Sequence, residues 1–221
     1  MIEGAAYLTL PTLSRRSGGP LLAHRYITAG SRLIDELAAA GPQGWIVDLR
    51  ENTGGNMWPM IAAIAGLLDR GVLGRFLLPD GRSQAWRLRR GYASGYVSLN
   101  RRPMARVPHR AQRRRGAPLA ALASARTASA GEAALIALRS QSPSRTFGTP
   151  TAGMTTGNIT HFLPDGTRLM ISVSHYADAE GRLIRGRIEP DEVVAGGEVG
   201  DAGGPGGGDS ALKQALAWIG A

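Results

Sequence analysis

The stretch PLAALASARTASAGEAALIAL, residues 118–138, decides the fold that we expect for this chain. Residues 118–123 form an uninterrupted apolar run with the length of a buried strand. A turn of small and hydroxyl-bearing residues follows, and residues 130–138 then repeat apolar side chains at helical spacing. A buried strand that leads through a short turn into a helix is the building unit of α/β proteins.

A similar order recurs elsewhere along the chain. Residues 45–49 predict a second short buried strand, residues 51–56 a loop, and residues 58–68 an apolar helix with a proline in its first turn. The recurrence of strand, loop and helix predicts the α/β class. We also expect a strand over 4–10, helices over 24–40 and 210–219 with Asp209 as the N-cap of the second, and hairpins that turn at 79–81 and 164–166.

Composition narrows the class of protein. The chain has 221 residues, of which 43% are hydrophobic and 19% charged, as in ordinary soluble globular proteins. The absence of cysteine excludes a disulfide scaffold, a thiol nucleophile and a thiolate metal site. No dinucleotide fingerprint or metal-ligand spacing occurs, so we expect neither cofactor nor metal. The first residues lack the features of a signal peptide and no apolar run could span a membrane, so the chain as written would stay in the cytoplasm, and the compartment stays open at this point.

The charge is strongly positive, at +9, and all but one of the 26 basic residues are arginines, the exception being Lys213. Seven arginines gather in residues 100–116, which we expect to be a solvated loop. Nucleic-acid binding is less expected there because no aromatic residue is available for stacking. We predict a catalytic core over 1–194, a glycine-rich linker over 195–208, and a C-terminal helix over 209–221 that packs on the core.

Ser129 is the candidate nucleophile, because it lies where the helix of residues 130–138 begins. At that place unpaired backbone N–H groups and the helix dipole favour developing negative charge, as a tetrahedral oxyanion requires. The alternative is that Ser129 is only an N-cap, with Glu132 three residues later completing a capping box. Both interpretations stay open at this point.

The loop after the strand of residues 45–49 is the second candidate element. Its consecutive Gly54 and Gly55 would let the backbone approach a ligand closely and point an N–H group at it. The lysine of a phosphate-binding loop is missing. We expect Asp48 and Arg50 to fix this loop through a charge-assisted contact.

Together the two loops make the chain resemble the C-terminal processing (tail-specific) serine peptidases over residues 4–194. The TASAGE sequence of residues 127–132 is most similar to the branch of that family that includes the nisin resistance proteins. The motifs that carry the resemblance, in the family's order, are YLTLP (7–11), WIVDLRENTGGN (45–56), RTASAGE (126–132), RTFGTPTAG (145–153), FLPDG (162–166) and IEPD (188–191).

The resemblance implies a fold and a site. The fold would be a spiral of ββα units similar to those of ClpP and the crotonases. Ser129 would be the nucleophile, and the oxyanion hole would combine the N–H of Ala130 with one from Gly54 or Gly55. A strand edge beside the site would hold an extended peptide or protein substrate by β-augmentation.

The general base does not follow from the resemblance. Aligning the GTPTAG loop puts Met154 where better-known relatives have a lysine, and Thr9 stands where a tricorn-like branch has a histidine. The branch with the TASAGE sequence takes its histidine from an N-terminal helical region. Of the histidines present, His161 is the weak candidate, because it follows the GTPTAG loop, and His24, His109 and His175 are better explained as structural or surface residues.

The sequence therefore leaves two functions open. The first is a serine-type endopeptidase that works through an acyl-enzyme on Ser129, its base supplied by His161, an N-terminal cap or a partner chain. The second is a core-only remnant that has lost its base and binds peptides without cutting them. A base within reach of the Ser129 hydroxyl distinguishes the two.

Overall fold

Five parallel strands form the first sheet of the computed structural model, which describes residues 1–14, 19–90, 94–108, 116–194 and 209–220. The strand of the deciding stretch lies in the middle of this sheet, and all five of its residues are buried. Such a strand is apolar on both faces because both faces of the sheet are covered. The order across the sheet is β1 (Ala6–Thr9), β2 (Trp45–Asp48), β7 (Leu119–Ala123), β8 (Ser144–Gly148) and β11 (Glu192–Val193).

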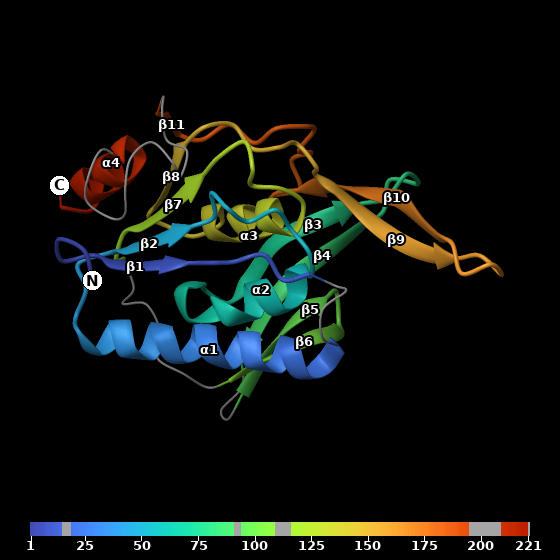
Figure 1. The fold of residues 1–221 in the computed structure, drawn as a ribbon, viewed down its shortest axis with the longest axis horizontal. Helices are drawn as coiled ribbons and strands as arrows, with labels where there is room; N and C mark the ends of the chain where they lie inside the picture. Colours follow the sequence, from blue (N-terminus) through green and yellow to red (C-terminus); the bar gives the residue numbers. More distant parts are fainter. Residues whose placement is uncertain (15–18, 91–93, 109–115, 195–208, 221) are drawn as a thin grey trace.

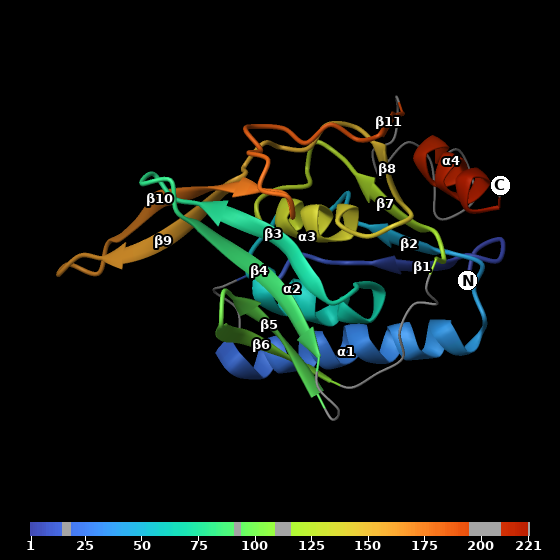
Figure 2. The ribbon, with the colours of Figure 1, turned by 180° about the vertical axis from the view of Figure 1, so that it is seen from behind.

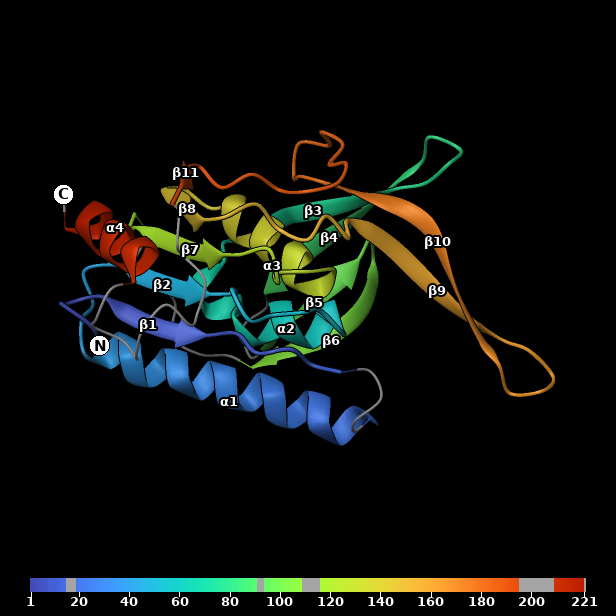
Figure 3. The same ribbon diagram turned by 45° about the horizontal axis from the view of Figure 1, so that its top comes forward.

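Six antiparallel strands form the second sheet. Strands β9 and β10 extend beyond the other strands as a projecting hairpin, which Figures 1 and 3 show in orange, and β9 is an edge strand. The order is β6 (Arg102–Pro108), β5 (Ser94–Leu99), β4 (Ser83–Arg90), β3 (Gly71–Leu77), β10 (Arg168–Ala177) and β9 (Thr156–Phe162).

The helices fill the space between the sheets and cover the parallel sheet. Helices α2 (Met57–Ala63) and α3 (Ala130–Arg139) lie between the two sheets, and the 3-10 turn η1 (Ala65–Leu67) continues α2. Helix α1 (Gly19–Ala39) runs beside α2 (Figure 2). Helix α4 (Ser210–Ile219) covers the other face of the parallel sheet, and Asp209 caps it by accepting a 3.0 Å hydrogen bond from the N–H of Leu212.

Two apolar cores follow from this layering. The larger core lies between the sheets and includes Trp86, Leu73 and Ile136 around α2 and α3. The smaller core lies under α4, where Ala211, Ala215 and Ile219 pack on residues of β2, β7 and β8. The strands make this face of the parallel sheet apolar, and α4 covers it.

Most expected elements are confirmed, with ends shifted by a few residues. The strands at 45–49 and 118–123, the two hairpins and the helices are present, and α1 begins at Gly19, earlier than expected. The expectation of a solvated loop over 100–116 was wrong in part, because Arg102–Pro108 forms β6 and buries Val107. Residues 109–115 and 195–208 lie outside the described residues, so the linker stays a prediction.

No helix among the described residues is long and apolar enough to cross a membrane.

Candidate active site

Ser129 lies at the junction between the central parallel strand and α3. It is the N-cap of α3 and has φ 51° and ψ −110°, in the left-handed half of backbone space that residues other than glycine rarely adopt. A backbone conformation of this kind is kept only where the surroundings fix it, and such positions cluster at functional sites. The side chain is half-buried and lines a cleft at this end of α3.

Glu132 fixes the backbone of Ser129 from inside the protein. Its Oε2 accepts a hydrogen bond of 2.7 Å from the N–H of Ser129, which confirms the expected capping contact. Its Oε1 accepts from the Thr151 hydroxyl at 2.5 Å and from the N–H of Gly153 at 2.8 Å. Burial raises the pKa of Glu132, and these hydrogen bonds offset part of that effect. One buried carboxylate thus joins the start of α3 to the loop after β8.

Replacing Glu132 with Gln is expected to destabilise the protein by about 1–3 kcal/mol, because the amide nitrogen cannot accept a hydrogen bond and leaves a buried donor unpaired. Urea denaturation followed by circular dichroism measures the change. Glu51→Gln is the matched control, since Glu51 pairs with Arg126 at 3.0 Å on the surface and should change stability little. Equal stability of Glu132→Gln and the unmodified chain would show that the carboxylate does not fix this turn.

Asn52 joins the second candidate loop to the same place. Its backbone oxygen accepts from the N–H of Ala128 at 2.9 Å, and its Nδ2 donates to the oxygen of Leu10 at 2.8 Å. Gly131 passes so close that an added Cβ would lie 2.7 Å from the Asn52 backbone oxygen, so this first turn of α3 requires glycine. The sequence analysis identified Gly54 and Gly55 in this loop but did not predict a role for Asn52.

Gly54 lies beside Ser129, and Gly55 lines the same cleft. A Cβ added to Gly54 would be 3.0 Å from the Cβ of Ser129, and both glycines have positive φ, at 106° and 120°. The N–H of Gly54 donates to Oδ1 of Asn52 at 3.0 Å. That bond occupies the Gly54 donor, which makes Gly55 the better of the two candidates for an oxyanion donor.

The cleft around Ser129 has a volume of about 580 Å³ and a largely apolar lining. Among the described residues that line it, none is Asp, Glu, His, Lys or Arg. The lining combines the small residues of both loops with large apolar side chains from several strands and from α2, among them Trp58, Phe76, Leu99, Met104, Ile159, Met170 and Val173.

Tyr176 is the ionisable side chain of this lining, and the sequence analysis did not find it. It belongs to β10 and is only 3% exposed. Burial raises the pKa of Tyr176 to about 12, and the charge of Glu132 acts in the same direction. No local signal marks this tyrosine, because the pairing of β10 with β3 brings it to the cleft.

The structure does not bring the candidate bases to Ser129. His161 lies on the exposed outer part of the β9–β10 hairpin, pairs with Leu169, and is not among the residues that line the cleft. His24 and His175 are exposed on α1 and β10, outside the same lining, and His109 lies outside the described residues. Lys213 is exposed on α4, which covers the opposite face of the parallel sheet.

The two positions at which relatives of other branches carry a base also hold no ionisable side chain here. Met154 is 60% exposed and follows the loop that Glu132 holds. Thr9 is exposed at the end of β1, opposite Asp48.

Arg50 forms an ion-pair cluster with Asp48 and Asp209 just before Asn52 in the chain. Arg50 binds Asp48 through Nη2 at 2.6 Å and Asp209 through Nη1 at 2.7 Å, and the Tyr7 hydroxyl donates to Asp48 at 2.6 Å. Burial acts to lower the pKa of Arg50, but the hydrogen bonds and charges of Asp48 and Asp209 outweigh it and raise the pKa. The expected contact of Asp48 with Arg50 is confirmed, and the contact with the N-cap of α4 was not foreseen.

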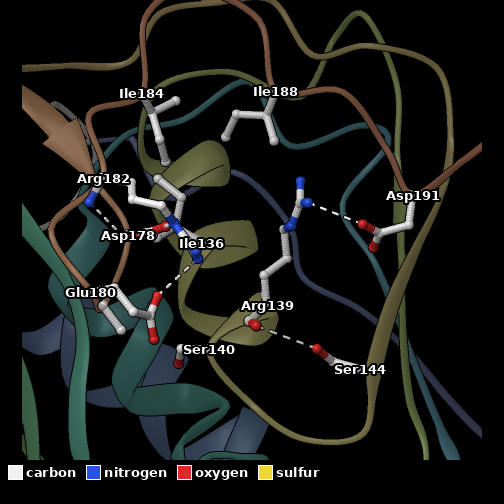
Figure 4. Close-up of a pocket in the computed structure, with 11 residues that line it drawn as sticks. Ile136, Arg139, Ser140, Ser144, Asp178, Glu180, Arg182, Ile184, Ile188 and Asp191 are labelled. Carbon is white, nitrogen blue, oxygen red and sulfur yellow. Dashed lines mark hydrogen bonds and ion pairs between the residues drawn. The ribbon is translucent and has the colours of Figure 1, made fainter.

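A second cavity, of about 430 Å³, lies at the other end of α3. Figure 4 shows its rim, where Arg139 pairs with Asp191 at 3.0 Å and Arg182 pairs with Asp178 and Glu180. The charged groups on this rim thus have partners within the rim itself. In the part of the chain that the structure describes, no group of His, Asp and Glu residues could hold a metal ion.

Comparison with known proteins agrees with this geometry. The model of peptidase family S41 matches residues 5–194. The nisin-resistance protein of Lactococcus lactis subsp. lactis is 29% identical over 150 residues, which are 67% of this chain and 45% of that protein. The chain therefore matches less than half the length of this curated relative.

Solved structures show the same fold. A lipoprotein from Streptococcus agalactiae is similar over 100% of this chain and 67% of its own, with a TM-score of 0.73 and 23% identity. The photosystem II D1 C-terminal processing protease is similar over 86% of this chain and 42% of its own, with a TM-score of 0.60 and 23% identity. At these identities the likeness supports the fold, and the α/β class expected from the sequence is confirmed.

The family match covers both sheets, the strand–turn–helix unit around Ser129 and the glycine loop beside it. The resemblance inferred from the motifs is thereby confirmed. This chain belongs to peptidase family S41, a family of serine peptidases.

Proposed function

We propose that the chain is a serine endopeptidase core that cleaves peptide bonds through an acyl-enzyme on Ser129. The observation that carries the proposal is the position of Ser129, at the start of a helix, inside a cleft, and with Gly54 beside its Cβ. In the proposed reaction, Ser129 Oγ bonds to the carbonyl carbon of the substrate while its proton passes to a base. The amine then leaves with a proton, and water hydrolyses the acyl ester.

The oxyanion hole in this proposal combines the N–H groups of Ala130 and Gly55. Ala130 is the first residue of α3, where a backbone N–H has no partner within its helix. Both residues line the cleft together with Ser129. Two such donors aimed at the developing negative charge are the arrangement that serine peptidases require.

The substrate in this proposal is an extended peptide whose side chains near the cleaved bond are apolar and uncharged. The large apolar lining and the absence of charged side chains among its described residues favour such groups. Strand β9 is an edge strand, and four of its residues, 156–159, line the cleft beside Ser129. A peptide added along this edge would gain backbone hydrogen bonds by β-augmentation.

The general base of this reaction stays unassigned among the described residues. A histidine from a partner chain or an N-terminal cap would complete the site for the endopeptidase. The second candidate function is a peptide-binding module that lacks this base and is catalytically impaired. The observation that favours it is a cleft lining with no Asp, Glu, His or Lys in the described part of the chain.

Labelling with a fluorophosphonate probe tests the two functions. We expect the unmodified chain to be labelled and Ser129→Ala to lose all labelling, because only an activated serine attacks the probe at a useful rate. Intact-protein mass spectrometry measures the adduct, and a peptide map places it. Ser124→Ala is the matched control, since the buried Ser124 lies in the same turn but donates to the oxygen of Arg50 at 2.7 Å.

The outcomes separate the hypotheses. A single adduct on Ser129, kept in Ser124→Ala, supports the endopeptidase. No adduct on a folded chain that still binds an apolar peptide supports the binding module. An adduct on another residue overturns the assignment of Ser129.

A further inference from the structure

The positive charge of the chain is concentrated in one stretch of the sequence. Residues 81–131 hold twelve arginines and neither Asp nor Glu, so their charge exceeds the net charge of +9 of the whole chain. The remaining residues are therefore net negative. Strands β4, β5 and β6 all lie within this stretch and are neighbours in the antiparallel sheet. Their pairing brings arginines from separate parts of the stretch together.

Two arginines and a tyrosine form a row across the outer face of these strands. Tyr96 of β5 is paired with Arg89 on one side and with Arg106 on the other. Both arginines are exposed and Tyr96 is half-buried, whereas Leu88, next to Arg89, is part of the core. Successive side chains of a strand point to opposite faces, so Arg87 lies on the outer face with Arg89, and we call Arg87, Arg89, Tyr96 and Arg106 the arginine face. In Figure 2, β3 and β4 cross in front of the helices, with this face toward the viewer.

The arginine face has no acidic partner within the described part of the chain. None of the ion pairs between described residues includes Arg87, Arg89 or Arg106. Elsewhere on the surface Arg145 pairs with Glu192 at 3.1 Å, so the other arginines are not all left in this way. A guanidinium group is suited to bind a carboxylate through two parallel hydrogen bonds. The arginine face therefore favours an anionic partner from outside the fold.

The arginine face borders the cleft of Ser129. Met104 of β6 lines that cleft and also lines an open hollow of about 360 Å³, whose lining includes Tyr96 and Arg106. Arg106 is two residues from Met104 along the same strand, which is about 7 Å. A peptide that leaves the cleft past Met104 would therefore reach Arg106 within a few residues.

We propose that the arginine face binds an acidic segment of the substrate peptide, outside the apolar residues that enter the cleft. The proposal rests on peptide binding in the cleft, as in the proposed function. The described lining of the cleft holds no Asp, Glu, His, Lys or Arg, so a preference for charge must come from a surface beside it. Every second side chain of an extended peptide is about 7 Å along, the same spacing as Arg87 and Arg89. Acidic residues at alternate positions would match this pair.

Two other anionic partners fit the arginine face less well. Single-stranded nucleic acid is held by several aromatic side chains that stack on bases, and Tyr96 is the one aromatic residue of this face. A membrane surface is held by exposed apolar side chains in addition to charge. Among the described residues of β4, β5 and β6, no large apolar side chain is exposed.

Peptide binding measured by fluorescence anisotropy tests the proposal. Three labelled peptides share an apolar centre and carry Asp, Asn or Lys at alternate positions of both flanks. The full chain with Ser129→Ala is used, so that cleavage cannot disturb the equilibrium. We expect the Asp peptide to bind about tenfold more tightly than the Asn peptide, as for two exposed ion pairs, and the Lys peptide to bind most weakly. The preference should decrease as salt is added.

Arg89→Gln with Arg106→Gln should remove this preference and leave the affinity for the Asn peptide within about twofold. The matched control is Arg32→Gln with Arg145→Gln, which removes the same net charge from two surface arginines that have acidic partners, Arg32 pairing with Glu36 at 3.6 Å. This control should keep the preference. Equal losses in the two double variants would show that net charge alone attracts the peptide and would overturn the proposal.

Binding of the same variants to labelled oligothymidylate and to vesicles that contain phosphatidylglycerol covers the other two partners. If the Asp and Asn peptides bind equally, or no peptide binds, the proposal is wrong. If, in that case, the arginine-face variant alone loses oligothymidylate or vesicle binding, the face binds nucleic acid or a membrane instead.

Fluorophosphonate labelling of the unmodified chain keeps this proposal separate from the proposed reaction. A chain that prefers the Asp peptide but takes no label supports recognition of acidic peptides by a binding module, and the endopeptidase fails. A chain that is labelled on Ser129 but shows no preference supports the endopeptidase and excludes the arginine face from substrate recognition.

Discussion

Replacing Arg50 with Met is expected to destabilise the fold by about 3–5 kcal/mol, because it leaves the buried Asp48 and the partly buried Asp209 without their cation. Arg50 is 3% exposed and binds Asp48 and Asp209 at 2.6 and 2.7 Å. Methionine fills a similar volume, so the loss measures the charge and its hydrogen bonds rather than a cavity. Guanidinium chloride would screen these ion pairs, so urea denaturation is the appropriate measurement.

Arg82→Met is the control for that substitution. Arg82 pairs with Asp80 at 2.6 Å, but its side chain is 77% exposed, and exposed ion pairs contribute little to stability. If Arg50→Met and Arg82→Met changed stability equally, the buried cluster would not hold the loop of Asn52 in place. A stable Arg50→Met variant that lost fluorophosphonate labelling would give the cluster a role in the site alone.

Replacing Gly55 with Ala is expected to lower the rate of fluorophosphonate labelling at Ser129 about 100-fold or more, the size of the loss when an oxyanion donor is displaced. A Cβ at this position would lie 1.9 Å from the backbone oxygen of Leu13, which real contacts do not allow. The loop must therefore move away from Leu13, and the hydrogen bond from the N–H of Asn56 to that oxygen, at 3.0 Å, must lengthen or break.

Gly81→Ala separates this effect from backbone strain. Gly81 has φ 81°, so alanine is strained there too, but a Cβ would meet nothing within 4 Å. It lies in the β3–β4 turn, and its variant should lose some stability and keep its labelling rate. Normal labelling of Gly55→Ala, or equal losses in both variants, would remove Gly55 from the proposed oxyanion hole.

The part of the site that the sequence could predict is the part built from neighbours in the chain. Ser129 follows a buried strand by six residues and begins a helix, and both patterns are local. Glu132 is three residues further, so its contact with the Ser129 N–H could be expected from capping alone. Its bonds to Thr151 and Gly153 could not, because they depend on where β8 leaves the sheet.

The remaining contacts depend on pairings between distant segments. Tyr176 lies 47 residues after Ser129, and only the register of β10 against β3 brings its ring to the cleft. Asp209 meets Arg50 across 159 residues because it caps α4, which packs on the parallel sheet. Strand β6 was missed because its exposed arginines hide the alternation around the buried Val107, and charged residues are what an edge strand carries.

The projecting β9–β10 hairpin also affects how the protein behaves in concentrated solution. Phe162 and Met170 are 65% and 73% exposed on it, and no strand of the described residues pairs with the outer backbone edge of β9. Such an edge admits a strand from any source, including another copy of the chain. The net charge of +9 keeps copies apart by mutual repulsion, and salt screens that repulsion over about 10 Å at 0.1 M. We therefore expect self-association through the β9–β10 hairpin to increase as the ionic strength rises, because salt weakens the repulsion between the positively charged copies.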